Sequence, residues 1–546
     1  MFLWLFILLT NNDSFNTDSI PVRDTVPYIT NFSKIGLLDT SLYQNQEIRY
    51  SYLKGFSRVM EYTPFLLKDK GYEFELLTPY PVCFLINGHT LDHYFLKDFN
   101  PYLIPLNFIK SVSFIKEYTN SGIGVLDLVT KINNFDQPYS YLYFTLLGPN
   151  TIYNIDFTRA LTNFSGIYLS GLYSRRYKWS ERTYLRTNSG YINIYDNHLI
   201  PGRVDMIFSE NDYDTLADIE FNDIALTLGD DFYKTAVFRT YKRDYIKGDR
   251  LITYGVNQKA LFIIRGFENV LKLYVLDSNY KTGGLGTFRQ RGLSFSHRVN
   301  HKFEPLKIGL GYQLEHRSDA GLVFNPQVAL TWLIFNEFQI SGSFGLFHIM
   351  PDFTSRYGSD HQWEDIIGNP LIKGEEHLQK EFCLHFRNSK LNLYHYNIKN
   401  YIFYQMDSAH CYSAINIGEG EIGGVEGFFT TPPFKNLSAR AAFNFIAMSD
   451  LPLLFPDASM KLELNWERRT VRSVMEFFIR SEFIGPRNDQ SGVSYEPFLI
   501  ASAGGCLRFL TLTLGISFDN IFDTKPVDFP NLNRHFGMEV MWEFWD

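Results

Sequence analysis

The sequence predicts an all-β transmembrane protein, a large antiparallel outer-membrane β-barrel with a small N-terminal α+β domain inside its lumen. Three observations support this fold class. Apolar and polar residues alternate over segments of about ten residues, the length of a barrel strand, along most of the chain. Aromatic residues make up 17% of the sequence, as the girdles at two membrane interfaces would require. No apolar run reaches the roughly 20 residues of a membrane-spanning helix.

The clearest alternation lies near the C-terminus. From 536 to 544 large apolar side chains alternate with Gly537, Glu539 and Glu543, and Met541 is the one exception. Period two places the two sets on opposite faces of a strand. A soluble sandwich strand also alternates, but here the polar side chains are small or charged, which indicates a wet lumen behind a lipid-facing surface. The same pattern recurs at 306–315, 460–466 and 509–518.

Composition divides the chain into four segments. Residues 1–10 hold a short apolar stretch typical of a signal peptide, although neither a charged start nor an Ala-x-Ala site accompanies it. Residues 11–45 are polar and are expected to form a periplasmic leader. Residues 46–135 mix helix and strand signals and predict the small lumenal domain, a plug. Residues 136–546 are strand-length segments separated by turns and predict the barrel.

The barrel segment sets the number of strands. At roughly 18–20 residues for a strand and its connection, it predicts about 20–22 strands, with an even number expected. The sheet has to close, because lipid cannot satisfy the hydrogen bonds of an open edge. A barrel of this width encloses a wide lumen, which large outer-membrane transporters fill with a plug.

Charge and cysteine content exclude some functions. The net charge of −8 argues against nucleic acid as a partner. The four cysteines, Cys83, Cys383, Cys411 and Cys506, have no metal-ligand spacing. Cys383 and Cys411 could face each other on neighbouring strands, but four separate thiols are the favoured interpretation.

Motifs in the predicted plug resemble those of TonB-dependent receptors. An apolar strand from residue 81 runs into the turn Asn87-Gly88, and residues 109–115 are similar to the next strand of that family's plug. Gly122 and Gly124 resemble its glycine turn, and Thr130-Lys131 resembles the end of its closing strand. Asn-Gly alone is first of all a hairpin turn. The resemblance therefore depends on the order and spacing of all these motifs.

Barrel motifs agree with this resemblance. Gly368-Asn369-Pro370-Leu371, followed by Glu375, Glu376 and Glu381, is similar to a Gly-Asn-Pro…Glu hairpin of the family, and 519–523 is similar to its Asn-Leu-Phe-Asp turn. Two stretches depart from the family pattern. Residues 73–79 lack its Arg-Gly strand, and residues 116–121 replace its Arg-Gly-Pro segment. The plug is therefore shortened.

The resemblance implies a function. A member of the family binds a scarce extracellular small molecule or metal complex and imports it across the outer membrane, with energy from a TonB-type coupling protein. Such a protein is a monomeric barrel in outer-membrane lipid and needs neither enzymatic activity nor a cofactor. Two alternatives stay open: a structural or assembly barrel that has lost coupling, and a passive porin with a partly occluded lumen.

The leader offers two candidates for the short segment that adds a strand to the coupling protein. Each places an acid and a hydroxyl before apolar residues, and each contains a proline that removes a ladder donor. A plain disordered leader is the alternative. The candidate residues are Asp18, Ser19, Ile20 and Val22 in the first segment, and Asp24, Thr25 and Val26 in the second.

Other polar groups carry weaker signals. His89 and His93 could share a helix face and bind a metal, but an exposed pair in a loop is the favoured interpretation. The acidic stretch 360–365 could hold calcium or contact a ligand, but a solvated extracellular loop is the favoured interpretation, and 210–214 is similar without the full calcium-loop spacing. No nucleophile elbow, P-loop or paired-cysteine site was found. The sequence therefore predicts no catalytic or metal site, and leaves the ligand-binding residues unknown.

Overall fold

The structure is a computed structural model. Among residues 1–138 it describes only 43–47, 66–69, 74–77, 82–87, 89–90, 109–115 and 124–130. From 139 to 545 it describes all residues except short segments at 148–149, 163–164, 179–182, 197–200, 214–216, 230–231, 245–248, 283–285, 336, 358, 361–364, 388, 407–411, 432–433, 435, 452–455, 489–492 and 527–533.

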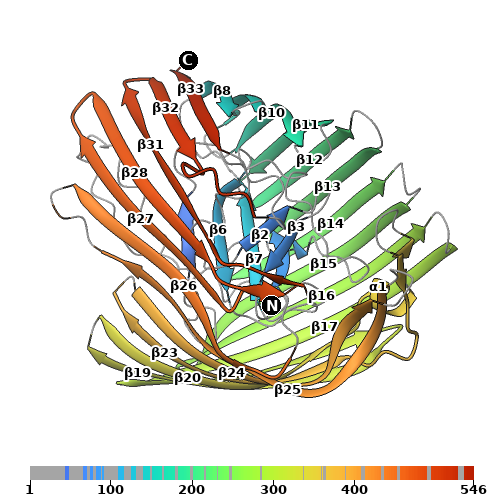
Figure 1. The fold of residues 1–546 in the computed structure, drawn as a ribbon. Coiled ribbons are helices and arrows are strands. Elements are labelled where there is room, and N and C mark those ends of the chain that lie inside the picture. The colour runs from blue at the N-terminus through green and yellow to red at the C-terminus, as the bar shows by residue number, and fades with distance from the viewer. Residues whose placement is uncertain are drawn as a thin grey trace. The chain divides into compact units, whose positions relative to one another are not determined.

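The dominant element is a closed antiparallel barrel, in which each strand pairs with its neighbours along the chain and β33 returns to pair with β8 (Figure 1). The first half consists of β8 (Tyr139–Leu147), β9 (Asn150–Ala160), β10 (Ser165–Lys178), β11 (Thr183–Asp196), β12 (Gly202–Tyr213), β13 (Ala217–Gly229), β14 (Tyr233–Asp244), β15 (Asp249–Ile264), β16 (Phe267–Thr282), β17 (Gly286–Phe303) and β18 (Leu306–Arg317). The second half consists of β19 (Gly321–Phe335), β20 (Phe338–Ile349), β23 (Glu375–Phe386), β24 (Ser389–Met406), β25 (Tyr412–Thr430), β26 (Leu437–Ser449), β27 (Ala458–Arg469), β28 (Ser473–Ile484), β31 (Phe498–Phe509), β32 (Leu512–Asp519) and β33 (His535–Trp545).

These 22 strands confirm the predicted barrel and its size. The even number follows from geometry. Every neighbouring pair is antiparallel, including the closing pair β33–β8, where Trp545 lies opposite Tyr139. A ring of strands whose chain direction alternates from one strand to the next can close only with an even number of strands. Closure removes the open sheet edges, whose hydrogen-bonding groups lipid could not satisfy.

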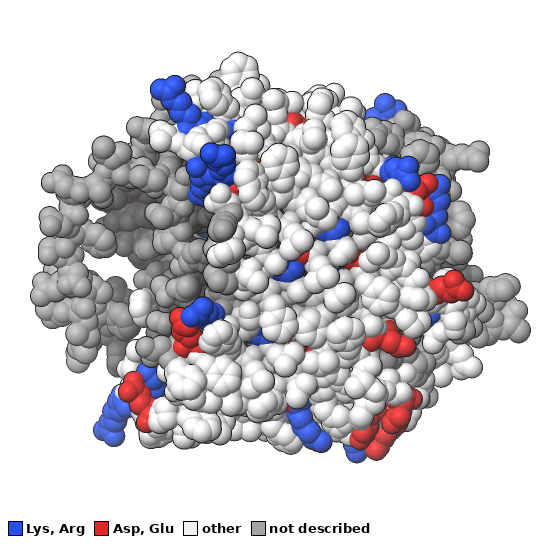
Figure 2. Space-filling view, turned by 60° about the vertical axis from the view of Figure 1, so that its left-hand side comes forward, with Lys and Arg blue, Asp and Glu red and all other residues white. Residues whose placement is uncertain are grey.

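The two faces of the barrel follow the alternation in the sequence. In β32, Leu514 and Ile516 are 45% and 48% exposed, whereas Thr513 and Ser517 are buried. Figure 2 shows one outer face of the barrel as a broad area with few charged side chains, and most of the Lys, Arg, Asp and Glu side chains in this view lie near its margins. The apolar side chains therefore form the outer surface and the polar ones line the inside, as lipid outside and water inside require.

One predicted segment differs in detail. Residues 509–518 are not a single strand, because β31 ends at Phe509 and β32 begins at Leu512. Leu510 lies in the turn between them, with a φ of 53°. Alternation in the sequence continues through this two-residue turn, so periodicity alone could not locate it.

The two rims of the barrel differ in the length of their connections. One rim has only short turns, such as 265–266 and 304–305, and both the start of β8 and the end of β33 lie there. At the other rim the first six connections are also short, whereas those at 350–374, 485–497 and 520–534 are long. Outer-membrane barrels place short turns at the periplasm and longer loops outside. We therefore assign the rim with the long connections to the cell exterior.

The long connections contain additional short elements. Between β20 and β23 lie α1 (Phe353–Tyr357), β21 (Ser359–Asp360) and β22 (Asp365–Ile367), and β22 pairs in parallel with β25. Between β28 and β31 lie β29 (Arg487–Asn488) and β30 (Ser494–Tyr495). The helix found in the described part of the chain, α1, is neither long nor apolar enough to cross a membrane.

The described residues before the barrel form two small sheets. A five-stranded sheet has the order β1-β6-β7-β4-β5, with β1 at Tyr43–Glu47, β4 at Val82–Ile86, β5 at His89–Thr90, β6 at Ile109–Ile115 and β7 at Gly124–Thr130. We call it the N-terminal sheet. A hairpin of β2 (Leu66–Asp69) and β3 (Phe74–Leu77) lies between β1 and β4 in sequence. The strands predicted from the plug motifs are thus present, while the helical part of the predicted domain lies outside the described residues.

Candidate functional site

A group of charged side chains lines the inner face of β26, β27 and β28. The strand register aligns Arg440, Glu463 and Arg480 in one row across these strands, and the row continues to Ser502 on β31. All four alternate with outward residues such as Leu464, which is 50% exposed. Cross-strand neighbours on one face of a sheet lie within contact distance, so the register alone brings these charges together.

Ion pairs connect this row. The Glu463 carboxylate accepts from Arg480 Nε at 2.5 Å and lies 3.6 Å from Arg440 Nη1 on its other side. Arg480 also lies over the Phe478 ring, with its guanidinium carbon 4.2 Å from the centroid. The Glu463 and Arg480 side chains are 11% and 13% exposed, whereas Arg440 is 33% exposed. Arg440 is therefore the member of this row most open to a ligand.

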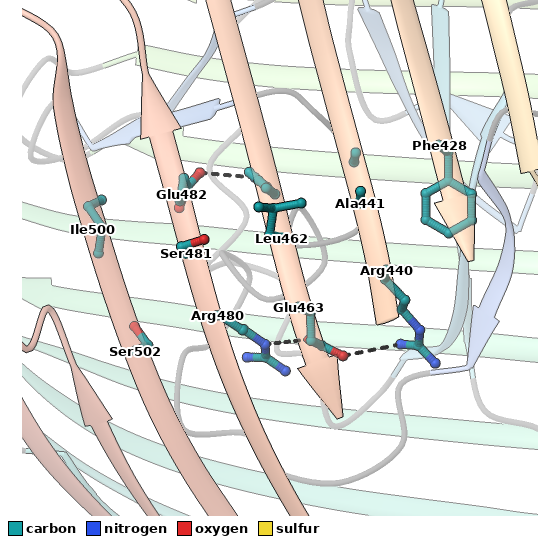
Figure 3. A pocket seen from close by; sticks show the side chains of 12 residues that line it. Phe428, Arg440, Ala441, Leu462, Glu463, Arg480, Ser481, Glu482, Ile500 and Ser502 are labelled. Atoms are coloured by element: carbon teal, nitrogen blue, oxygen red, sulfur yellow. Dashed lines mark hydrogen bonds and ion pairs between the residues drawn. The ribbon is translucent and has the colours of Figure 1, made fainter. Parts of the chain in front are cut away.

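A second row lies two residues further along the same strands. It runs from Phe428 through Ala442, Lys461 and Glu482 to Ile500. Lys461 Nζ and Glu482 Oε1 are 3.2 Å apart. Figure 3 shows the two rows side by side, with the paired charges in the middle and the apolar Phe428 and Ile500 at opposite ends. The two rows, together with Ala441, Leu462 and Ser481 between them, line a cavity of about 60 Å³.

We call the side chains of these two rows the charged wall. Three cations and two carboxylates give it a formal charge of +1. Guanidinium groups match the paired oxygens of carboxylates and similar anions. The separation of 3.6 Å between Arg440 Nη1 and Glu463 Oε1 is long for a direct hydrogen bond. The apolar ends provide contact area for a ring or an aliphatic group.

The long connection between β20 and β23 is fastened to the barrel rim. Buried Arg317, the last residue of β18, donates from Nη2 to the Pro351 carbonyl at 2.6 Å and to Asp319 Oδ2 at 2.8 Å. Arg356 in α1 adds a hydrogen bond to the Asp319 carbonyl. The Phe288 and Tyr357 rings lie 5.2 Å apart. One end of the connection is thus held against β17 and β18.

Asp319 is the anionic centre of this attachment and lies in the turn between β18 and β19. Burial opposes the charge of its carboxyl group, but hydrogen bonds from Arg317 and Gln290 outweigh that effect. The charge of Arg356 acts in the same direction. The pKa of Asp319 therefore lies below its ordinary value, and the carboxylate is the form that binds the connection.

The Gly-Asn-Pro…Glu motif fastens the other end of the connection. Asn369 accepts from the Leu371 amide at 3.0 Å and donates to the Ala414 carbonyl at 3.2 Å. Glu375 Oε1 accepts from the Ile402 amide at 2.7 Å. This amide lies two residues after Asn400, whose φ is 55° and whose pair with Gly418 is missing from an otherwise unshifted β24–β25 register. Glu375 thus satisfies a backbone donor at an irregularity in β24.

The two other glutamates of the motif have different environments. Glu381 lies buried inside the barrel, where Tyr396 Oη and Gln379 Nε2 donate to it at 2.7 and 2.8 Å. Glu376 points to the other face and its side chain is 43% exposed. The motif thus combines two buried structural acceptors with one exposed residue.

The structure places some of the residues that the sequence singled out. Asn87 forms the turn between β4 and β5, with a φ of 52°, and is 5% exposed. Gly124 and Thr130 begin and end β7 and lie opposite Val82 and Ile109. Gly88, Gly122 and Lys131 lie outside the described residues. So do the leader candidates Asp18, Ser19, Ile20, Val22, Asp24, Thr25 and Val26.

The described cysteines form no disulfide. Cys383 and Cys506 are both in the thiol form, and Cys411 lies outside the described residues. Over the part of the chain that the structure describes, no group of three His, Cys, Asp or Glu side chains could hold a metal ion. His89 lies in β5, and His93 is beyond the described range.

Sequence reasoning missed the charged wall. The alternation of polar and apolar residues predicts which face of β27 and β28 is polar. It does not predict which charged residues lie opposite each other on neighbouring strands. Alternating charged residues in β27 and β28, with Arg440 on the neighbouring β26, were the available signal. The register that aligns them depends on the turns between the strands.

Comparison with known proteins identifies the family. Residues 99–521 match the family model described as TonB dependent receptor-like, beta-barrel. The match covers most of the chain, and the chain therefore belongs to this family, whose members are receptors of the outer membrane. The sequence-based recognition is confirmed. No match was found among curated protein sequences.

Solved structures share the fold at low sequence identity. The ferric enterobactin receptor PfeA of Pseudomonas aeruginosa, in complex with enterobactin, aligns with a TM-score of 0.73 and 14% identity over 90% of this chain and 97% of its own. The siderophore receptor PirA of Acinetobacter baumannii aligns with a TM-score of 0.73 and 12% identity over 90% and 96%. The FrpB iron transporter of Neisseria meningitidis gives 0.73 and 12% over 92% and 100%.

Proposed function

We propose that this protein is an outer-membrane receptor that binds a scarce extracellular ligand and imports it with energy from a TonB-type coupling protein. The observation that supports the proposal is the closed 22-strand barrel, in a chain that matches the TonB-dependent receptor family. The N-terminal sheet precedes the barrel along the chain, and its strands β4, β6 and β7 contain the plug motifs. A barrel of this width leaves a lumen that needs a plug, and we assign residues 46–135 to that role. The leader at 11–45 would then reach the coupling protein.

We propose an anionic chelate of iron as the first ligand to test. The charged wall supports this choice, because its cations outnumber its carboxylates and Arg440 is accessible. Phenolate and carboxylate oxygens of such chelates suit guanidinium donors. The similar structures named above include receptors for siderophores, and one contains enterobactin. No reaction on the ligand is required, so we assign no catalytic residue.

A second candidate function is a structural barrel that has lost energy coupling. The two departures in the predicted plug, at 73–79 and 116–121, favour it, because they remove arginines that the family pattern contains. Ligand binding without accumulation would distinguish this function from transport.

The test separates binding from transport. Strand addition to the coupling protein depends on main-chain hydrogen bonds, and a further proline removes a donor and fixes φ. Ile20→Pro or Val26→Pro should therefore abolish energy-dependent accumulation of radiolabelled ferric chelate while leaving binding at the cell surface unchanged. Asn12→Pro, upstream of both segments, is the matched control.

Each outcome has a meaning. Loss of accumulation in one variant supports transport and identifies the segment used. Unchanged accumulation in both variants would exclude both segments. Surface binding by the parent protein without accumulation would support the structural alternative.

A further inference from the structure

The outer surface of β14, β15, β16 and β17, four consecutive strands of the barrel wall (Figure 1), changes abruptly from apolar to basic. The strand register aligns one outward-facing row of Val237, Val256, Val275 and Leu293. Val237, Val275 and Leu293 are 49%, 40% and 47% exposed. Two residues nearer the exterior rim, the next outward-facing row consists of Arg239, Tyr254, Asp277 and Arg291. The apolar surface that faces lipid therefore ends between these two rows.

Two more outward-facing rows lie between this boundary and the exterior rim. The first consists of Tyr241, Ile252, Asn279 and Arg289, and the second of Arg243, Arg250, Lys281 and Thr287. Five cations of the three polar rows form one group, in which Arg239 is half-buried and the others are exposed. We call this group the basic patch: Arg239, Arg250, Lys281, Arg289 and Arg291.

The basic patch contains far more positive than negative charge. Arg289 Nε donates to Asp277 Oδ1 at 2.8 Å, and Arg291 Nε lies 3.9 Å from Oδ2 of the same carboxylate. Among the residues that the structure describes, no carboxylate forms an ion pair with the other three cations of the patch. Arg243, at its edge, lies opposite Glu220, and these two charges offset each other. Five cations and the carboxylate of Asp277 give the patch a formal charge of +4.

This excess charge is unfavourable without an outside partner. Arg250 lies directly opposite Lys281, and like charges in opposed positions destabilise a sheet. Lys399, on the outer face of β24, has a different environment, because its Nζ lies 3.0 Å from Glu419 Oε1. The chain thus balances an outward-facing lysine there with its own carboxylate. In the basic patch an anion from outside the chain is needed to do the same.

One aromatic ring organises two of the donors. The guanidinium carbons of Arg239 and Arg250 lie 5.6 and 5.5 Å from the centroid of the Tyr241 ring. Contact with the ring restricts both side chains while leaving their N–H groups able to donate. Two guanidinium forks are therefore held near each other, and each can match two oxygens of a phosphate group.

We propose that the basic patch binds the phosphate group of a lipid in the outer leaflet of the membrane. The patch lies at the level of the lipid headgroups, because it begins where the apolar surface ends on the side of the exterior rim. The acyl chains of the same lipid would lie on Val237, Val275 and Leu293. Clusters of Lys and Arg beside a membrane are typical of sites that recognise anionic lipids. The proposal depends on the assignment of the exterior rim, but not on the imported ligand or on energy coupling.

Native mass spectrometry of the full-length protein in neutral detergent tests the proposal. The probes are phosphatidic acid, whose headgroup is a phosphate monoester, and phosphatidylcholine with the same acyl chains. The parent protein should bind phosphatidic acid about tenfold more tightly or better. Arg239→Gln and Arg250→Gln together should weaken this binding by about 25-fold, because each cation near a membrane surface contributes about fivefold. Arg468→Gln is the matched control, since Arg468 is exposed on the outer face of β27 near the opposite rim.

Heat-modifiable migration on gels shows whether the double variant has folded. If it has not, Lys281→Gln replaces it, with a loss of about fivefold expected. Equal affinity of the parent for the two lipids would overturn the proposal, and so would an equal loss in the Arg468 variant. Inorganic phosphate at the same concentration should not displace phosphatidic acid, because it lacks the acyl chains. Full displacement would assign the patch to a free anion and overturn the lipid site.

Discussion

Arg317 Nη2 donates a 2.6 Å hydrogen bond to the carbonyl oxygen of Pro351, which lies 34 residues further along the chain. This contact joins the end of β18 to the start of the long connection before β23. Since Arg317 also binds Asp319, one buried guanidinium holds a turn and a loop together. The attachment therefore fixes the position of this part of the connection at the outer rim beside β17 and β18.

Replacing Arg317 should release this connection. Arg317→Ala removes the donor shared by the partly buried Asp319 carboxylate and the Pro351 carbonyl, a loss of about 1–3 kcal/mol. We expect trypsin to cleave after Arg356 or Lys373 much faster than in the parent protein. Arg291→Ala is the control, because that side chain is 64% exposed and should change the cleavage rate little. Equal cleavage in both variants would contradict the anchoring role.

The attachment should also depend on pH. The pKa of Asp319 is lowered in the folded state, so its contribution to stability is complete above the ordinary carboxyl pKa of about 3.9 and is lost as the pH falls through the lower folded value. Cleavage within 350–374 should therefore stay slow at pH 5 and rise only well below pH 4, measured with an acid-stable protease such as pepsin. Asp319→Asn should show only the pH dependence of the protease itself, measured on an unfolded substrate. A transition of the parent near pH 6 would exclude Asp319 as its cause.

Glu375 binds the Ile402 amide with one carboxylate oxygen and lies 2.8 Å from His377 Nε2 with the other. Glu375→Ala leaves the Ile402 N–H without its acceptor, at a cost of about 1–3 kcal/mol. Hydrogen exchange at that amide should accelerate, and the urea midpoint should fall. Glu375→Gln retains an acceptor oxygen and should recover most of the loss. Glu376→Ala, on the exposed neighbour, is the control, and a similar loss there would contradict the assignment.

The two faces of β27 should tolerate charge differently. Leu464→Arg places a charge in lipid, which costs roughly 2–4 kcal/mol near the membrane midplane. Asn465→Arg points inside, where Glu476 lies 3.2 Å from the present amide and can pair with the new guanidinium. Refolding into lipid vesicles at increasing urea measures both variants. Equal damage would contradict the assignment of the faces.

The charged wall should contribute to ligand affinity. Arg440→Gln and Arg480→Gln each remove a charged donor and should weaken binding of an anionic ferric chelate by about tenfold. Arg468→Gln is the control, because Arg468 is an exposed residue of β27 on its outer face. Equilibrium binding to intact cells at 4 °C, where transport stops, is the measurement. Unchanged affinity in both variants would place the ligand elsewhere.

The fold could be predicted because lipid imposes a simple rule on every strand. Leu514 and Thr513 were assigned to opposite faces from alternation, and the structure confirms it. The strand number followed from the length of the barrel segment. The turn at Leu510 escaped prediction because apolar alternation crosses it without a break.

The candidate site was harder to predict because its residues come from separate strands. Arg440, Glu463 and Arg480 become neighbours only through the register of β26, β27 and β28. Register depends on the geometry of each turn, which a single sequence determines only where the turn residues are distinctive.

The uneven outer rim has a consequence for what other organisms can recognise. Between β8 and β19 each outer connection is only a few residues long, whereas the connections at 350–374, 485–497 and 520–534 are long. Antibodies, bacteriophages and protein toxins commonly bind the exposed loops of a cell-surface protein. On this receptor the long loops belong to one part of the barrel, from β20 to β33. The Arg317 attachment would present the first of them as a conformational rather than a linear epitope.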